Sequence, residues 1–151
     1  MPARSTRVLV PAGALGLGWD ADALEAGIAR APDLIAIDGG STDSGPAYLG
    51  RGVSKYSRAQ TRGEWATLID AARRAGCPLV IGTAGTCGAG AAVDWLLAIT
   101  REILTETGHS ARIALLYCDR EAEALAAAWD RVTPLPGAPE AGPDDLVDCT
   151  N

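Results

Sequence analysis

The stretch PLVIGTAGTCGAG, residues 78–90, decides the fold class, because a short apolar run meets a glycine-rich segment there. Residues 78–81 have the apolar composition of a buried strand. Residues 82–90 hold four glycines, and a helical pattern follows that ends at Gly108. A strand, a loop and a helix in this order form the repeating unit of parallel α/β sheets.

The same unit recurs on both sides of this stretch. Strands are expected at residues 7–10, 34–37, 78–81 and 112–117. Four helices are expected. The first runs from Asp20 to Ala31, and the second begins at the capping-box residues Thr61 and Glu64 and ends at Gly76. The third follows residues 82–90 and ends at Gly108, and the fourth begins after Asp119. The pattern predicts an α/β, three-layer domain with a mainly parallel, Rossmann-like sheet of about four strands, in the order 2-1-3-4.

The chain divides into two parts at about residue 132. Residues 1–132 are predicted to form the α/β domain. Residues 133–151 contain four prolines, Pro134, Pro136, Pro139 and Pro143, and are interpreted as a linker or the truncated start of a further region. The alternative for this end is a frayed natural terminus.

The composition restricts the kinds of partner and the cellular compartment that we expect for this protein. A net charge of -6 over 151 residues argues against nucleic acid and anionic membranes. No apolar run approaches the ~20 residues that span a bilayer, and we expect a cytoplasmic protein. The four cysteines form no C-x-x-C pair, so free thiols are expected rather than a zinc or redox motif.

In open α/β sheets, ligands bind outside the carboxyl ends of the strands. Four segments should meet at that edge: residues 11–19, 38–57, 82–90 and 118–119. Glycines let backbone amides approach a ligand, and the start of a helix favours an anion. The candidate ligand-binding residues in the first and third segments are Gly13, Gly82, Thr83, Gly85 and Thr86. Neither the dinucleotide fingerprint nor the phosphate-binding loop can be read there, and tight strand-to-helix packing is the alternative.

Asp38 is the candidate catalytic residue, because it places a carboxylate at a strand end before a polar turn. It could act as a general acid or base, or it could fasten its own loop through backbone hydrogen bonds. The turn adds Gly39, Gly40, Ser41, Thr42 and Asp43 as ligand-binding candidates. A magnesium site with Asp43 and Asp119 lacks a ligand spacing to support it, so no metal is predicted.

A basic stretch follows on the same edge. Arg51, Lys55, Arg58 and Arg62 occur without an acidic residue between them, whereas the rest of the chain has 9 basic and 19 acidic residues. We take Lys55 and Arg58 as candidate ligands of a carboxylate or phosphate, with a solvated loop as the alternative. Cys87 lacks an obvious base, because the only histidine, His109, should lie at the opposite edge.

Three of these segments resemble the amino-terminal domain of the bacterial acyclic terpene utilisation family. They are residues 10–18 (VPAGALGLG), 37–50 (IDGGSTDSGPAYLG) and 81–90 (IGTAGTCGAG). The resemblance runs to about Arg131, and members of the family are generally longer than this chain. It implies a role in the catabolism of branched terpenoid acids and their coenzyme A esters. It marks the loops as the site and assigns no chemical role to any residue.

Two hypotheses follow. The first is an enzyme, or part of one, acting on a small branched carboxylate or acyl-coenzyme A. Asp38 would be the acid or base, and loop amides would hold the anionic group. The second is a non-catalytic ligand-binding or assembly subunit with the same pocket. The sequence does not identify a cofactor, and a homo-oligomer and a partner subunit both remain open.

Overall fold

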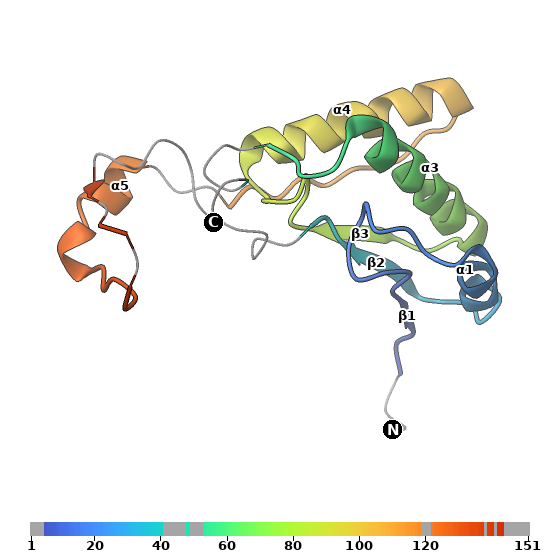
Figure 1. The fold of residues 1–151 in the computed structure, drawn as a ribbon. Coiled ribbons are helices and arrows are strands. Elements are labelled where there is room, and N and C mark those ends of the chain that lie inside the picture. Colours follow the sequence, from blue (N-terminus) through green and yellow to red (C-terminus); the bar gives the residue numbers. More distant parts are fainter. Residues whose placement is uncertain are drawn as a thin grey trace.

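The computed structural model describes residues 5–40, 48, 53–118, 122–137, 139–140 and 142–143. Three parallel strands form the sheet: β1 (Val8–Leu9), β2 (Leu34–Asp38) and β3 (Leu79–Gly82). Three helices pack against it: α1 (Ala21–Ile28), α3 (Arg58–Ala75) and α4 (Gly90–Thr107) (Figure 1). The mixed α/β class and the parallel direction of the strands are therefore confirmed.

The strand order is β1-β2-β3, so the expected order 2-1-3-4 is wrong. The central strand is β2, the longest of the three, whose Ile35 and Ile37 side chains are buried. Only two residues of β1 are paired, and short strands suit the edge of a sheet. Apolar runs indicate that strands exist, but they carry little information about which strands are neighbours.

The expected fourth strand is not a strand in the structure. Residues 112–117 run alongside the body from the end of α4 without joining the ladder (Figure 1). Leu116 is 81% exposed, and the Tyr117 hydroxyl donates to Asp94 Oδ1 on α4 at 2.6 Å. The sheet of the described residues thus has three strands rather than about four. The apolar pattern indicated β propensity, but pairing also requires a backbone partner in register.

Local hydrogen bonds explain the helix ends. Asp20 caps α1 as predicted, accepting from the Ala23 amide at 2.8 Å, and left-handed glycines end α3 at Gly76 and α4 at Gly108. The start of α3 differs from the expectation. Ser57 is its N-cap, not Thr61, which lies one turn inside the helix. Glu64 does not complete a capping box, because its carboxylate accepts from the amide of Gly16.

The three helices cover one face of the sheet. Leu9 lies against Gly27 of α1, and both Leu9 and Ile28 pack against the cluster of Ile35 and the α3 residues Ala71 and Ala72. Ile37 packs with residues of α3 and α4 in the main core cluster, which comprises Leu15, Ile37, Trp65, Leu68, Leu96, Ile99 and Ile103. On the opposite face Val8 and Val80 are half exposed. Within the described chain the body therefore has two layers, not three.

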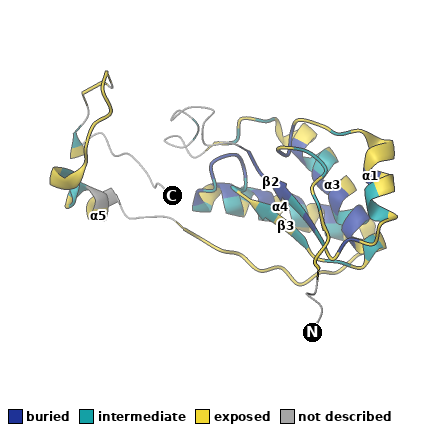
Figure 2. Cartoon of the chain, turned by 90° about the horizontal axis from the view of Figure 1, so that it is seen from below, coloured by how far each residue is buried: buried dark blue, intermediate teal, exposed yellow. Residues whose placement is uncertain are grey.

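Handedness explains this difference. When strands follow one another in one direction across a sheet, right-handed crossovers place all connecting helices on the same face. The remaining helical pieces are α5 (Ala122–Ala126) and the 3-10 turn η2 (Trp129–Arg131). They replace the single helix expected after Asp119 and lie away from the sheet in Figures 1 and 2. Among the described helices, none has the length and apolarity that crossing a membrane requires.

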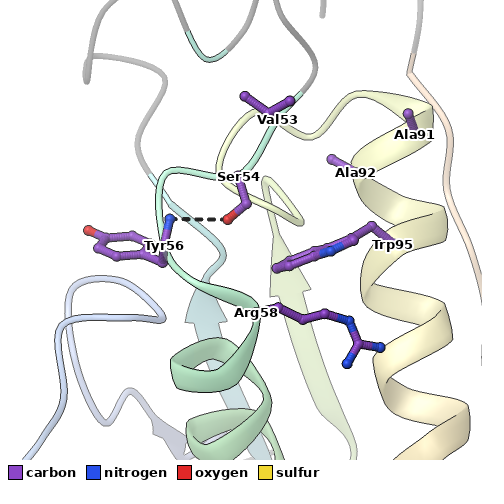
Figure 3. Close-up of a pocket in the computed structure, with 7 residues that line it drawn as sticks. All are labelled: Val53, Ser54, Tyr56, Arg58, Ala91, Ala92 and Trp95. Atoms are coloured by element: carbon purple, nitrogen blue, oxygen red, sulfur yellow. Dashed lines mark hydrogen bonds between the residues drawn. The ribbon is translucent and has the colours of Figure 1, made fainter.

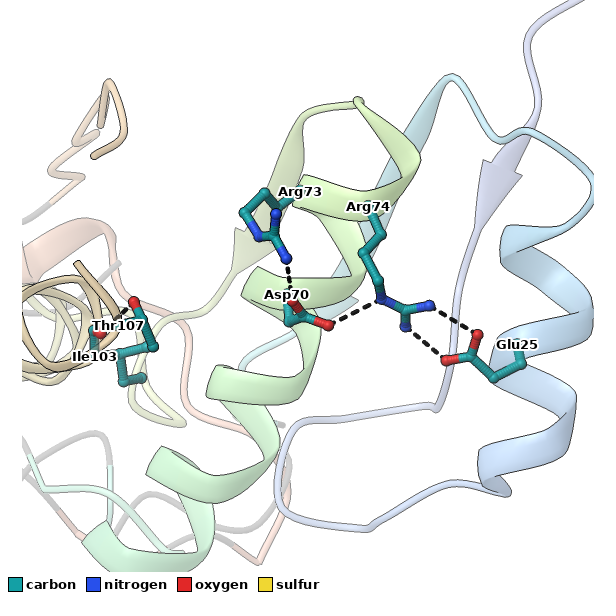
Figure 4. A network of polar contacts seen from close by, with 6 residues as sticks. All are labelled: Glu25, Asp70, Arg73, Arg74, Ile103 and Thr107. Carbon is teal, nitrogen blue, oxygen red and sulfur yellow. Dashed lines mark hydrogen bonds and ion pairs between the residues drawn. The ribbon is translucent and has the colours of Figure 1, made fainter. Parts of the chain in front are cut away.

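A surface network joins α1 to α3 (Figure 4). Arg74 donates to both carboxylate oxygens of Glu25, at 2.6 and 2.9 Å, and to Asp70 at 2.9 Å. Arg73 also donates to Asp70. A hydrogen bond from Arg74 holds the pKa of Glu25 below its ordinary range. A hydrogen bond from Arg73 does the same for the pKa of Asp70. The network fixes α1 beside α3 and leaves the glycine loops uninvolved.

Candidate functional site

Two glycine loops interlock at the carboxyl ends of β2 and β3. The Gly39 amide donates to the Gly82 carbonyl at 2.7 Å, and the Thr86 amide donates back to the Gly39 carbonyl at 3.1 Å. A Cβ at position 39 would lie 2.5 Å from the Thr83 carbonyl oxygen, so a side chain cannot be accommodated without movement of the backbone. Gly39 therefore permits the direct backbone contact between the loops.

The β3–α4 loop is strained at two threonines. Thr83 has a φ of 48° and Thr86 a φ of 82°, in the left-handed region that β-branched residues rarely adopt. Such residues cost about 1–3 kcal/mol each and need surrounding bonds to hold them. The fully buried Thr86 hydroxyl accepts from the Lys55 amide at 3.1 Å and lies 3.3 Å from Ser54 Oγ. These bonds attach residues 54–55, just before α3, to the glycine loop.

Asp38 lies at the same place and is engaged by its own loops. Its Oδ1 atom accepts from the Thr83 hydroxyl at 2.6 Å and from the Gly40 amide at 3.0 Å. The carboxylate remains exposed, and it does not line the pocket described below. This geometry matches the alternative in which Asp38 fastens its own loop. The Oδ2 atom of Asp38 takes part in neither of these two hydrogen bonds.

A pocket opens next to these loops, at the start of α4 (Figure 3). Its volume is about 350 Å³, and its lining consists of Val53, Ser54, Tyr56, Arg58, Ala91, Ala92 and Trp95. The N-cap residue of α4 is Ala89, which makes no side-chain cap hydrogen bond. The amides of Ala92 and Val93 donate to the Ala89 carbonyl at 2.8 and 2.9 Å, and the helix dipole gives this end a partial positive charge. The pocket thus combines this helix end and one guanidinium with apolar walls.

Arg58 is shared between the pocket and an ion pair. Its guanidinium donates to Glu102 of α4 at 2.6 Å, with both side chains 45% exposed. This hydrogen bond lowers the pKa of Glu102 below its ordinary value. Arg62 pairs in the same way with Glu106, one turn further along. Arg58 and Arg62 therefore both form ion pairs with carboxylates of α4, and of these two arginines only Arg58 also lines the pocket.

The first loop reaches the site through Gly16. The Gly16 amide donates to Glu64 at 2.6 Å, and Gln60 Nε2 donates to the Gly16 carbonyl at 2.6 Å. A Cβ at position 16 would lie 2.4 Å from the Tyr56 ring, and the φ of Gly16 is 101°. Gly16 thus lets the first loop pack on Tyr56, one of the pocket walls. Gly13, the expected contact residue of this loop, is exposed and has open space around it.

The structure brings most of the other predicted residues together. Asp38, Gly39, Gly40, Gly82, Thr83 and Thr86 meet where the loops interlock, and Gly85 packs on the pocket residue Ala92. Lys55 joins them through its backbone, and its ammonium lies 5.9 Å from the centre of the Tyr56 ring. The predicted residues Ser41, Thr42 and Asp43 lie outside the described residues.

Sequence reasoning missed most of the pocket itself. Trp95, one turn into α4, packs against the main core cluster and also lines the pocket. Trp19 of the first loop also packs against this cluster and does not line the pocket. Ser54 and Tyr56 gave no pattern of their own.

The remaining candidates lie apart from the pocket. His109 follows the end of α4, about 27 Å from the start of an 18-residue helix. Cys87 is buried at the base of the loop, and Cys77, Cys87 and Cys118 are present as thiols. Within the described ranges, no three histidine, cysteine or acidic side chains gather as metal ligands would.

Fold and pocket together define a parallel α/β domain with a ligand-sized pocket at the carboxyl ends of its strands. Comparisons with protein-family models, with curated proteins and with solved structures gave no match. The resemblance to the acyclic terpene utilisation family therefore remains a hypothesis that rests on the three loop segments alone.

Proposed function

We propose that this chain binds a small ligand with an acidic group and an apolar body in the pocket at the start of α4. The observation that carries the proposal is the composition of that pocket. Arg58 and the first turn of α4 supply positive charge, while Val53, Ala92 and Trp95 supply apolar surface. Its volume of about 350 Å³ falls within the usual range of small-molecule sites, roughly 300–1,000 Å³.

Arg58 can bind such an acid without losing Glu102. A guanidinium has five N–H donors in a fixed fork, and the bond to Glu102 uses NH2. A carboxylate in the pocket could accept from the remaining donors. The indole of Trp95 would pack against a short branched chain. These features support a branched carboxylate, one of the two ligands that the family resemblance implies.

An enzyme acting on this ligand is the second candidate. The feature that favours it is the pair of strained threonines, Thr83 and Thr86, beside Asp38, because backbone strain gathers at active sites. In this version Asp38 acts as the acid or base, and the ligand reaches from the pocket across the interlocked loops. We place the protein in the cytoplasm, where thiols such as Cys77 and Cys118 stay reduced.

Calorimetric titration with isovalerate, isovaleryl-coenzyme A and the neutral amide isovaleramide tests the proposal. Isovalerate or its thioester should bind, and Arg58→Gln should weaken binding about tenfold or more, the scale of a lost charge-assisted hydrogen bond. Arg62→Gln is the matched control, because Arg62 also pairs with a carboxylate of α4 but does not line the pocket. Equal effects of the two substitutions, or equal binding of acid and amide, would contradict it.

A further inference from the structure

Two hydroxyl groups meet beside the pocket at the start of α4. Thr86 Oγ1 in the β3–α4 loop and Ser54 Oγ, shortly before α3, lie 3.3 Å apart, within hydrogen-bond distance. Thr86 is fully buried, whereas Ser54 is half-buried and lines the pocket (Figure 3). Which of the two hydroxyls donates therefore decides what Ser54 offers to a ligand.

The burial of Thr86 decides the direction of this bond. A hydroxyl has one hydrogen to donate and two lone pairs that accept. Thr86 Oγ1 already accepts from the Lys55 amide at 3.1 Å, and its own hydrogen needs an acceptor. Among the described residues, that acceptor is Ser54 Oγ. The opposite direction would bury the Thr86 hydrogen without a partner, which is costly because the group gives up its bonds to water. Thr86 therefore donates to Ser54.

With this direction, both acceptor positions of Ser54 Oγ are occupied. It accepts from the Thr86 hydroxyl and, at 3.2 Å, from the Tyr56 amide, the bond drawn in Figure 3. The hydrogen of the Ser54 hydroxyl remains, on a side chain that lines the pocket. Ser54 is therefore a hydrogen-bond donor toward the pocket, and it cannot accept from a ligand without losing one of its two bonds.

The other polar side chains of the pocket are also mainly donors. The guanidinium of Arg58 and the indole N–H of Trp95 can donate but cannot accept. Of the other lining side chains that the structure describes, only that of Tyr56, with its hydroxyl, can also accept. A polar group of a ligand beside Ser54, Arg58 or the indole N–H thus gains a hydrogen bond only if that group is an acceptor.

We propose that Ser54 determines the specificity of this pocket and that the ligand is an oxo acid, with its carboxylate at Arg58 and its carbonyl oxygen at Ser54. This inference rests on the proposed function, because it requires that an acid binds in the pocket. A carbonyl oxygen accepts from Ser54 and, unlike a hydroxyl, brings no hydrogen that needs an acceptor. An ammonium group in its place would set one donor against another, and unpaired polar groups are what make a site reject a close analogue.

Calorimetric titration with three acids of one carbon skeleton tests the role of Ser54. Isovalerate has no polar group beside its carboxylate, its 2-oxo derivative has a carbonyl there, and the amino acid valine has an ammonium group. The oxo acid should bind about fivefold or more tightly than isovalerate, the scale of one hydrogen bond, and free valine should bind more weakly than both. In Ser54→Ala the advantage of the oxo acid should disappear. Ser57→Ala is the matched control, because Ser57 caps α3 and does not line the pocket, and it should keep that advantage.

The outcomes separate this inference from the proposed function. If none of the three acids binds, the proposed function fails and the role of Ser54 fails with it. If isovalerate binds as tightly as the oxo acid, or free valine does, the proposed function stands and the role of Ser54 is overturned. A preference for the oxo acid that persists in Ser54→Ala would also overturn it. Should Ser54→Ala not fold, the comparison of the three ligands in the wild type decides, because it requires no variant.

Discussion

The hydroxyl of Thr83 donates to Oδ1 of Asp38 at 2.6 Å, although the two residues end different strands and are 45 positions apart. This bond holds Thr83 in a left-handed conformation and keeps the β3–α4 loop against the end of β2. The pocket at the start of α4 is next to this contact.

Thr83→Val should destabilise the protein by about 1 kcal/mol, the net contribution of a typical hydrogen bond. Valine keeps the shape and the strain of the threonine but leaves Asp38 Oδ1 with only the Gly40 amide. Thr83→Ser retains the hydroxyl and should remain closer to the wild type. Urea unfolding of the three proteins provides the comparison, and a serine variant as unstable as the valine variant would show that the hydroxyl is not the cause.

Gly39→Ala should destabilise the protein by about 1–3 kcal/mol, the usual cost of overpacking. The new methyl group would lie 2.5 Å from the Thr83 carbonyl and 2.7 Å from the Gly82 carbonyl, and both are backbone atoms. Gly82→Ala is the control, because no atom lies within 4 Å of its Cβ position. The midpoints of urea unfolding measure both, and similar midpoints would refute the interlocked arrangement of the loops.

The surface network should stabilise the protein only above the acidic range. In the folded state, Arg74 and Arg73 depress the pKa values of Glu25 and Asp70. A carboxylate whose pKa is depressed in the folded state stabilises the protein at pH values above its pKa in the unfolded chain, which is about 4.3 for Glu25 and about 3.9 for Asp70. This stabilisation is lost as the pH falls through the pKa of the folded state. The difference in free energy of unfolding between the wild type and Arg74→Met should be small, because the ion pairs are exposed, and it should disappear as the pH is lowered.

Urea titrations between neutral pH and the acidic limit of folding check this dependence. Arg101→Met is the control, because Arg101 is an exposed helical arginine without an ion pair among the described residues. A gap for Arg74→Met that persists unchanged in acid would show that packing of the side chain, and not its charge, is responsible.

The thiols should differ in reactivity. Burial raises the pKa of Cys77 above its ordinary value, whereas Cys118 is exposed. Because the thiolate is the reactive form, iodoacetamide should modify Cys118 before Cys77 and the buried Cys87. Titration of the denatured, unreduced protein should find all four thiols. Peptide mass spectrometry gives the order, and faster labelling of Cys77 would contradict the packing of Cys77 beneath β2.

Local patterns predicted local structure well. The strands at residues 34–37 and 78–81 and the helix ends at Gly76 and Gly108 were expected, because apolar runs and left-handed glycines act over a few residues. The strand order and the bare second face were not expected. Both depend on which strands pair, and residues 112–117 show that a strand-like pattern alone does not create a partner.

The same distinction applies to the site. Asp38, Gly39 and the loop of residues 82–90 were predicted to meet, since parallel strands bring their carboxyl ends to one edge. The walls of the pocket depend on contacts between distant parts of the chain. The capping-box interpretation of Thr61 failed because Glu64 bonds to the first loop at Gly16. Trp95 and Tyr56 became pocket residues only through the packing of α3, α4 and the first loop.

The proposed function requires that an acidic ligand binds at the start of α4. The most direct measurement is a map of amide and indole chemical-shift changes in the ¹⁵N-labelled full chain during titration with isovalerate and isovaleryl-coenzyme A. We expect saturable shifts at Ser54, Ala91, Ala92 and the indole of Trp95, and their loss in Arg58→Gln. Shifts that instead cluster around His109, or that persist in Arg58→Gln, would contradict the claim.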